Sequence, residues 1–337
     1  MRAGIIGFGG MGQRHYRAYA GTDIDVVAVC DVRPERVREV APELPPAQVY
    51  DDYRRLLERE QLDLLSVVSN GPTHAEITMA ALEAGVPRVL CEKPMATSLA
   101  DAERVIDAAR RTGGRVSVNH IRRWSDGYAR LLDQLQRGEW GELRHVYFHS
   151  GSTGLGNFVI HAFDLMRYLT GAEPAWVAGG LDATGTTNPR GAQFRDPAGY
   201  GMVMFDNGCR GLVDSGEDTG IQYLFTLATT YGRVIIDELN GEWMIRARSA
   251  EDQAAPLTRY GLPMSQVPFE APRWDIVELT RGALLELAGD GPLSSTPEDG
   301  LAALQMVVAF HESQRLGNAR VDLPLTGSAR TLEIPIG

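Results

Sequence analysis

The sequence predicts two domains: an α/β domain with a doubly wound parallel sheet, and an α+β domain with a large open, mainly antiparallel sheet. From residue 1 to 120, short apolar runs alternate with helical patterns, as is typical of a parallel sheet with helices on both faces. From residue 175 to 247, strand-like runs follow one another without a helical pattern between them, which favours antiparallel pairing. We expect the domains to span residues 1–121 and 122–337.

The first predicted strand leads into a glycine-rich turn. Ala3–Ile6 is apolar and precedes the stretch Gly7-Phe8-Gly9-Gly10-Met11-Gly12, a G-x-G-x-x-G pattern that opens a helical pattern over Met11–Ala20. Such a turn needs glycine for its tight bend, for the approach of a pyrophosphate and for helix–strand packing. The helix N-terminus then offers N–H groups to phosphates. These six residues are candidate binders of a dinucleotide.

An acidic residue follows the second strand. Asp25–Cys30 reads as a strand, and Asp31 comes 19 residues after Gly12. A carboxylate there can accept hydrogen bonds from the ribose hydroxyls of NAD, and it would repel the 2′-phosphate of NADP. The sequence therefore favours NAD. Arg33 would still allow NADP, and Asp31 could instead be a turn residue at a strand end.

The fourth strand ends in a cluster of polar residues. An apolar run over Leu62–Ser69 is followed by Asn70-Gly71-Pro72-Thr73-His74, in which Pro72 can open a helix. Ligands of open parallel sheets bind at the carboxyl ends of the strands. We expect a cofactor to be contacted by four side chains at this edge: Ser69, Asn70, Pro72 and His74. His74 can equally be a helix-start histidine that makes local hydrogen bonds.

The fifth strand, Arg88–Cys91, delivers Glu92-Lys93-Pro94 to the same edge of the sheet. Of the 33 Lys and Arg residues, 32 are Arg and one is Lys93. A bias toward Arg removes any lysine that is needed only for charge. An ammonium differs from a guanidinium because its pKa shifts readily on burial, so the lone lysine is a candidate for chemistry. The alternative is a residual surface lysine.

The second half contains another candidate pair. After a helix over Gly127–Arg137, a strand over Glu142–Ser150 and a glycine-rich loop, residues Asn157–Leu169 show helical periodicity. Asn157 and His161 are four residues apart and can therefore face the same way. A histidine is the usual general acid or base near neutral pH. The alternative for His161 is a core histidine on an amphipathic helix.

The remaining segments favour strands. Asp206-Asn207-Gly208 is a hairpin turn signal between two of them. Residues 250–272 read as a long surface loop, and helices are expected over 275–287 and 298–315. The six expected strands are Ala175–Leu181, Tyr200–Phe205, Gly208–Asp214, Gln222–Thr229, Arg233–Asp237 and Glu242–Ala247.

Three of these features together resemble a known family. The G-F-G-G-M-G turn, the strand-end Asp31 and the E-K-P sequence around Lys93 are similar to those of the glucose–fructose oxidoreductase, inositol dehydrogenase and MocA-like (Gfo/Idh/MocA) family. The resemblance implies a Rossmann domain followed by a domain with an open sheet. It also implies NAD(P)-linked oxidoreduction of sugars, cyclitols or related compounds, with Glu92 and Lys93 near the nicotinamide.

The family pattern D-x-x-x-H-x-x-D is matched with one departure. Its histidine falls on His161, its later aspartate on Asp164, and its first aspartate on Asn157. An amide can neither take a proton nor carry a negative charge. If the resemblance holds, Asn157 orients a substrate hydroxyl, while Lys93 and His161 handle the proton. Asp164 belongs more naturally to the structural part of the pattern.

Composition excludes several other classes of function. A net charge of −11 argues against nucleic-acid binding, and no apolar run is long enough to span a membrane. The N-terminus reads as a strand rather than a signal peptide. Three well-separated cysteines fit a reducing cytoplasm without disulfides, and no metal-ligand spacing is present. We expect a sugar or polyol substrate, and the family habit implies a homo-dimer or homo-tetramer formed through the C-terminal sheet.

Two other functions remain open. An NAD-dependent glycosidase of the same family would oxidise its sugar only transiently and release an aglycone. A nucleotide-sensing regulator would keep the fold without turnover, and Asn157 argues weakly for it. Arg122, Arg123 and Trp124, where the chain crosses between domains, could contact substrate, but salt bridges and a hinge tryptophan explain them more simply.

Overall fold

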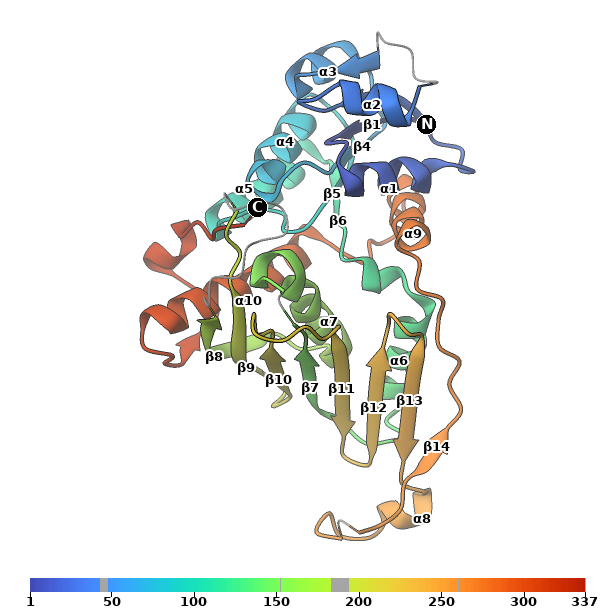
Figure 1. The fold of residues 1–337 in the computed structure, drawn as a ribbon, viewed down its shortest axis with the longest axis vertical. Helices are drawn as coiled ribbons and strands as arrows, with labels where there is room; N and C mark the ends of the chain where they lie inside the picture. Colours follow the sequence, from blue (N-terminus) through green and yellow to red (C-terminus); the bar gives the residue numbers. More distant parts are fainter. Residues whose placement is uncertain (43–47, 152, 183–193, 260, 337) are drawn as a thin grey trace. The chain divides into compact units, whose positions relative to one another are not determined.

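The structure, a computed structural model, describes residues 1–42, 48–151, 153–182, 194–259 and 261–336 (Figure 1). The chain divides into two compact units. The first contains Met1–Trp124, Asp275–Leu304 and Thr326–Gly337, and the second contains Ser125–Trp274 and Gln305–Leu325. Two C-terminal segments thus pack with the N-terminal unit. These units are defined by contacts within the structure, so the domain boundary expected after residue 121 stays a prediction.

The first unit contains a six-stranded parallel sheet, which confirms the predicted doubly wound fold. The strand order is β3-β2-β1-β4-β5-β6. The order reverses between β1 and β4, and in open sheets of this kind ligands bind outside the carboxyl ends of the strands at that point. The strands are β1 (Arg2–Ile6), β2 (Asp25–Cys30), β3 (Val49–Tyr50), β4 (Leu64–Val67), β5 (Arg88–Cys91) and β6 (Arg115–Val118).

Helices connect these strands, and their starts follow from the sequence. Asp52 caps α3 by accepting a hydrogen bond from the Arg54 N–H over 3.0 Å, and Ser98 caps α5 in the same way with the Asp101 N–H over 3.1 Å. The helices of this unit are α1 (Gly10–Tyr19), α2 (Glu35–Val40), α3 (Tyr53–Arg59), α4 (Gly71–Glu83), α5 (Leu99–Thr112) and α9 (Ile276–Ala288), with short 3₁₀ turns at Ile121–Trp124 and Gly327–Thr331.

Helix α9 completes the hydrophobic core of the first unit from far along the chain. Its buried Leu284 and Leu287 belong to the same apolar cluster as Ala18 and Tyr19 of α1. The Arg281 side chain also donates a hydrogen bond from Nε to the Ala18 carbonyl oxygen over 3.0 Å. Helix α9 was predicted from the sequence, but its partner was not.

The second unit is built on a nine-stranded sheet, which confirms the predicted open and mainly antiparallel sheet. Its order is β14-β13-β12-β11-β7-β10-β9-β8-β15, and only the β7–β10 pair is parallel. The expected turn at Asp206-Asn207-Gly208 joins β9 to β10. The strands are β7 (Leu143–His149), β8 (Pro174–Asp182), β9 (Ala198–Phe205), β10 (Arg210–Asp214), β11 (Leu224–Thr229), β12 (Gly232–Asp237), β13 (Glu242–Ala247), β14 (Ser265–Val267) and β15 (Val321–Asp322).

Helices cover one face of this sheet. Tyr128 of α6 (Asp126–Arg137) packs edge-on against Trp243 of β13, with ring centroids 4.8 Å apart. Phe163 of α7 (Ile160–Thr170) contacts Phe310 of α10 (Pro297–Arg315), and Phe310 lies over Gly179 of β8. Along β12 and β13 the side chains alternate between this buried face and an open one.

Two local predictions were wrong, and one strand was missed. Residues 250–272 were expected to form an irregular loop, but their described part contains α8 (Ala250–Gln253) and β14, with residue 260 outside the described residues. The strand β15 was not predicted. Both of these strands, β14 and β15, are edge strands of two or three residues that are held by backbone pairing with a neighbour. They are too short to show an alternation of apolar and polar side chains. The helix expected over Asn157–Leu169 begins instead with a π-helical turn, Leu155–Val159.

Candidate active site

The glycine turn between β1 and α1 is shaped by two close backbone approaches. Gly7 has φ +95°, and a Cβ placed on it would lie 2.5 Å from the Val68 carbonyl oxygen. A Cβ on Gly12 would lie 2.1 Å from the Gly7 carbonyl oxygen. A side chain at either position would therefore force the turn away from β4 or away from α1.

The other two glycines of the turn face open space. A Cβ on Gly9 or Gly10 would meet no atom within 4 Å. Helix α1 starts here with no acidic side chain in its first turn and no side-chain cap on its N–H groups. An uncapped helix N-terminus behind an open glycine surface suits a phosphate anion. The turn, which includes Phe8 and Met11, thus fits the pyrophosphate of a dinucleotide.

Asp31 ties the end of β2 to this turn. Its Oδ2 accepts a hydrogen bond from the Phe8 N–H over 2.7 Å, and its Oδ1 accepts one from the Arg33 N–H over 2.9 Å. The residue is 9% exposed, and each oxygen keeps a lone pair for another donor. Arg33 itself is exposed. The carboxylate predicted to read the ribose is therefore held in place by the glycine turn.

The residues after β4 lie at the same edge but differ in exposure. Ser69 is partly exposed, and Asn70 and Pro72 are exposed. His74 is 2% exposed, with Nδ1 2.8 Å from the Pro94 carbonyl oxygen and Nε2 2.9 Å from the Ser69 carbonyl oxygen. These are the local hydrogen bonds considered as the alternative for this residue. A direct contact between His74 and a cofactor stays a prediction.

Lys93 follows β5, beside a buried carboxylate. Lys93 is partly exposed, and Glu92 is 4% exposed. The Lys93 N–H donates a hydrogen bond to Glu92 Oε2 over 3.3 Å. The first unit thus brings Lys93, the glycine turn, Asp31 and Ser69 to the carboxyl ends of β5, β1, β2 and β4.

Five buried polar residues are linked by hydrogen bonds that lead to Glu92, the chain neighbour of Lys93. We call them the Glu92 cluster: Tyr19, Ser66, His15, Glu92 and Asn119. The Tyr19 hydroxyl lies 2.7 Å from Ser66 Oγ, which is 3.2 Å from His15 Nδ1. His15 Nε2 is 3.0 Å from Glu92 Oε1, and Asn119 Nδ2 donates to the same oxygen over 2.6 Å. This cluster was not predicted from the sequence. Its one sequence signal is the i, i+4 spacing of His15 and Tyr19 on α1.

The cluster keeps Glu92 ionised. Burial by itself raises the pKa of Glu92, but hydrogen bonds from His15 and Asn119 and the charges of His15 and Lys93 outweigh it and lower the pKa to about 2. The carboxylate therefore carries a full negative charge beside Lys93 at neutral pH.

The second unit holds Asn157 and His161. Asn157 lies in the π-helical turn, and His161 lies in the first turn of α7, with its ring 6.3 Å from that of Phe158. Both are partly exposed, whereas Asp164 is 1% exposed. Because Lys93 belongs to the first unit and these two belong to the second, a shared substrate for the three is a proposal, taken up below.

Asp196 shapes the π-helical turn that carries Asn157. Its two carboxylate oxygens accept hydrogen bonds from the Gly156 N–H over 2.8 Å and from the Asn157 N–H over 2.7 Å. A Cβ on Gly154 would lie 2.2 Å from this carboxylate, so the glycine makes room for it. Gly154 in the glycine-rich loop therefore leaves space for the Asp196 carboxylate that caps the turn, a contact that the sequence did not reveal. Residue 152 of this loop lies outside the described residues.

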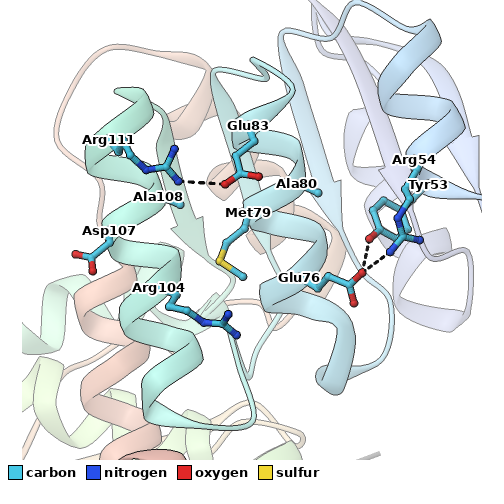
Figure 2. A pocket seen from close by; sticks show the side chains of 10 residues that line it. All are labelled: Tyr53, Arg54, Glu76, Met79, Ala80, Glu83, Arg104, Asp107, Ala108 and Arg111. Atoms are coloured by element: carbon cyan, nitrogen blue, oxygen red, sulfur yellow. Dashed lines mark hydrogen bonds and ion pairs between the residues drawn. The ribbon is translucent and has the colours of Figure 1, made fainter.

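A surface pocket on α3, α4 and α5 contains none of the predicted site residues (Figure 2). In it, Arg54 Nη2 lies 2.6 Å from Glu76 Oε1, and Arg111 Nη2 lies 3.1 Å from Glu83 Oε1. Its charges thus neutralise one another. Within the described residues no group of three His, Cys, Asp or Glu side chains is placed to hold a metal ion, and no helix is long and apolar enough to cross a bilayer.

Comparisons with known proteins agree on the kind of protein. Residues 1–120 match the Gfo/Idh/MocA profile, described as an oxidoreductase family with an NAD-binding Rossmann fold. An inositol 2-dehydrogenase of Klebsiella pneumoniae is 30% identical over 238 residues, which cover 66% of this chain and 68% of the relative.

A second curated relative and a solved structure extend this result. An inositol 2-dehydrogenase of Salmonella paratyphi B is 32% identical over 183 residues, or 50% of this chain, and the match spans only about half, 54%, of that relative. The crystal structure of an oxidoreductase from Agrobacterium radiobacter, in complex with NAD⁺, L-tartaric acid and magnesium, has a TM-score of 0.78 at 19% identity, over 96% of this chain and 98% of that one. At this identity the likeness shows the fold alone.

Proposed function

Because the chain belongs to the Gfo/Idh/MocA family of oxidoreductases, we propose that it is a dehydrogenase that transfers a hydride between a nicotinamide cofactor and a hydroxyl-bearing carbon of a sugar, cyclitol or sugar derivative. The observation that carries this proposal is the edge of the parallel sheet. At the carboxyl end of β1 lie an open glycine turn and the uncapped N-terminus of α1. The only lysine of the chain lies at the carboxyl end of β5 in the same parallel sheet. The names of the inositol 2-dehydrogenase relatives support the substrate class.

Asp31 supports NAD as the preferred cofactor. Its carboxylate is anchored to the glycine turn and adds negative charge where the 2′-phosphate of NADP would lie. Arg33, exposed two residues further on, is the side chain that would pair with that phosphate if NADP is used.

The proposed mechanism divides the work between cofactor and protein. A bound nicotinamide supplies the hydride chemistry, and the protein positions the substrate and moves the proton. Lys93 donates a hydrogen bond to the reacting oxygen. His161 takes or returns the hydroxyl proton, alone or through Lys93. Asn157 orients a neighbouring hydroxyl, because its amide can donate and accept hydrogen bonds but cannot take the proton.

Activity with a panel of substrates tests the function. Purified protein is given NAD or NADP with cyclitols, aldoses, sugar acids and sugar nucleotides, and the absorbance of the reduced nicotinamide is followed. We expect turnover that prefers NAD and falls on the order of 10²- to 10⁴-fold in Lys93→Met. Arg111→Met is the matched control, since it removes a cation whose side chain is 63% exposed in the same unit. Comparable losses in both variants, or full activity of Lys93→Met, would refute the role of Lys93.

If no substrate in the panel produces reduced cofactor, two further measurements distinguish the rival functions. An NAD-dependent glycosidase would release an aglycone without a net gain of reduced cofactor. A nucleotide-sensing regulator would bind the cofactor without turnover and retain a specific protein partner in pull-down.

We also propose that a second copy of the chain covers the open face of the nine-stranded sheet. The strand register aligns one row of mostly apolar side chains across that face: Met202, Leu212, Tyr147, Thr226, Ile235 and Met244. On one side of the row lie Arg210, Arg233 and Arg246, and on the other lie Asp214 and Asp237. A two-fold pairing that reverses the strand direction would set the basic side of one copy on the acidic side of the other.

A cytoplasmic location fits the cysteines. Cys30, Cys91 and Cys209 are buried free thiols. Burial raises the pKa of Cys91 to about 12, which keeps it an inert thiol. Thiols of this kind are typical of a reducing compartment, and we propose that the protein works there.

A further inference from the structure

The Glu92 cluster places hydroxyl, imidazole and carboxylate groups in series, yet its burial rules out nucleophilic catalysis. Ser66, His15 and Tyr19 are 0%, 0% and 3% exposed. A nucleophilic serine must reach a substrate, and Ser66 Oγ instead lies between the Tyr19 hydroxyl and His15 Nδ1. At its other end the cluster reaches Glu92, which accepts the backbone N–H of the partly exposed Lys93.

Hydrogen bonds link Tyr19, Ser66, His15 and Glu92 in series, whereas the buried Oδ1 of Asn119 has no partner among the described residues. Glu92 is an acceptor only, so both His15 Nε2 and Asn119 Nδ2 donate to it. With the proton on Nε2, Nδ1 accepts from the Ser66 hydroxyl, and Ser66 Oγ accepts from the Tyr19 hydroxyl. Within the cluster Glu92 carries the negative charge near neutral pH, because burial raises the pKa of Tyr19 whereas the pKa of Glu92 is lowered to about 2.

The other ionisable groups around Glu92 do not cancel that charge. Burial raises the pKa of Tyr19 and of Cys91 and lowers the pKa of His74, so all three are neutral near pH 7. The opposite charge nearest in sequence is the ammonium of Lys93. The ionisable groups facing Glu92 come from α1, from α4 and from its own chain neighbours: His15, Tyr19, His74, Cys91 and Lys93.

We propose that the Glu92 cluster is a positioning device for Lys93, which holds a buried carboxylate beside Lys93 and favours the ammonium form of that lysine over the neutral amine. The cluster also fixes the start of the lysine, because Glu92 Oε2 accepts the Lys93 backbone N–H. The interaction is reciprocal: the lysine charge helps to keep Glu92 ionised, so the carboxylate must favour the charged lysine equally. The consequence for catalysis rests on the function proposed above, whereas the charge pairing does not.

Because Lys93 is the only lysine, its titration can be observed directly. Protein grown with ¹³Cε-labelled lysine, and free of any lysine-containing tag, gives one lysine resonance, whose shift is followed with pH in the absence of cofactor. In the wild type we expect a midpoint at or above the ordinary value of about 10.4, although partial burial alone would lower it. A wild-type midpoint below about 9 overturns the proposal.

Variants then isolate the charge. Glu92→Gln keeps the shape and removes the charge, and we expect the Lys93 midpoint to fall by about one to two pH units. His15→Gln keeps a neutral donor to Glu92, so the midpoint should stay within about half a unit. Ser117→Ala is the control, because Ser117 is equally buried on β6 but donates to the Ser295 carbonyl oxygen instead.

Turnover provides a separate test of the consequence. If the chain is the proposed dehydrogenase, the basic limb of its kcat/KM profile should move to lower pH in Glu92→Gln and stay in place in Ser117→Ala. If no substrate is turned over, the proposed function fails while the nuclear magnetic resonance titration still decides the charge pairing. Equal Lys93 midpoints in the wild type and in folded Glu92→Gln would refute the pairing whatever the activity.

Discussion

Glu92 stabilises the fold only while it is ionised. Its pKa is lowered from 4.5 to about 2 in the folded state, because the stabilising hydrogen bonds and charges outweigh burial. A depressed carboxyl pKa contributes stability that is complete above the unfolded-state value and is lost as the pH falls through the folded-state value. The sensitive window for this residue therefore lies between about pH 5 and pH 2.

Acid unfolding should reveal this contribution. Between about pH 5 and pH 2 we expect the unfolding free energy of the wild type to fall by about 3 kcal/mol more than that of Glu92→Gln, because only the wild type must protonate a stabilised carboxylate. Urea unfolding curves at fixed pH measure the difference. Parallel pH dependences in the two proteins would contradict it, since the other carboxylates are common to both.

Among single residues, those in local motifs could be predicted from the sequence, whereas those that come into contact only in the folded chain could not. Gly7 and Gly12 were predicted because their roles follow from spacing within one turn. His15 and Glu92 are 77 residues apart, and no local pattern connects a helix histidine to a strand-end glutamate. Long-range hydrogen bonds of this kind depend on strand order, which a single sequence does not specify.

Among the elements, the π-helical turn Leu155–Val159 is held by a carboxylate from outside it. Asp196 accepts the N–H groups of Gly156 and Asn157, as an N-cap does, and so fixes the backbone from which Asn157 extends. Wider turns of this type often occur at functional sites. Asp196 is therefore a positioning residue for Asn157.

Removing this cap should affect both stability and turnover. We expect Asp196→Ala to lower the unfolding free energy by about 1–2 kcal/mol and to reduce kcat of the proposed reaction, because Asn157 loses its fixed backbone. Thermal unfolding and steady-state kinetics measure the two effects. Ser249→Ala is the matched control, since it removes the cap of the short exposed α8. An unchanged kcat in Asp196→Ala would argue against the positioning role.

Most elements could be predicted, and the failures have physical reasons. The strands Arg88–Cys91 and Glu242–Ala247 have the predicted bounds because apolar runs or strict alternation end at clear turn residues. Edge strands such as Ser265–Val267 gain their structure from a neighbour rather than from their own side chains. The π-helical turn needs Asp196, which is 39 residues away from Asn157.

At the scale of the whole molecule, the open sheet face determines how copies would associate. We expect the wild type to sediment as a homo-dimer or homo-tetramer and Leu212→Glu to sediment as a smaller species, because the substitution buries a charge at the centre of the apolar row. Analytical ultracentrifugation measures the mass. Leu285→Glu is the control, since Leu285 is 51% exposed on α9 and belongs to the first unit rather than to the sheet. A monomeric wild type, or an unchanged mass in Leu212→Glu, would refute the pairing.

The fold class of both parts could be predicted from the order of the elements, but their division along the chain could not. Helical periodicity identifies Ile276–Ala288 as a helix without indicating that Leu284 and Leu287 pack with Ala18. The apolar pattern of a helix does not specify which hydrophobic core the helix packs into.

The packing of α9 on α1 has a consequence for the order of events during synthesis. On the ribosome, residues 1–124 emerge first, but the apolar side of α1 around Ala18 and Tyr19 stays uncovered until residues beyond Leu287 have been made. The apolar surface of α1 in the nascent N-terminal segment therefore stays partly exposed to solvent while about 150 further residues are translated. A truncated chain that ends before residue 276 would keep this surface exposed permanently, so quality-control chaperones and proteases would treat it as unfinished.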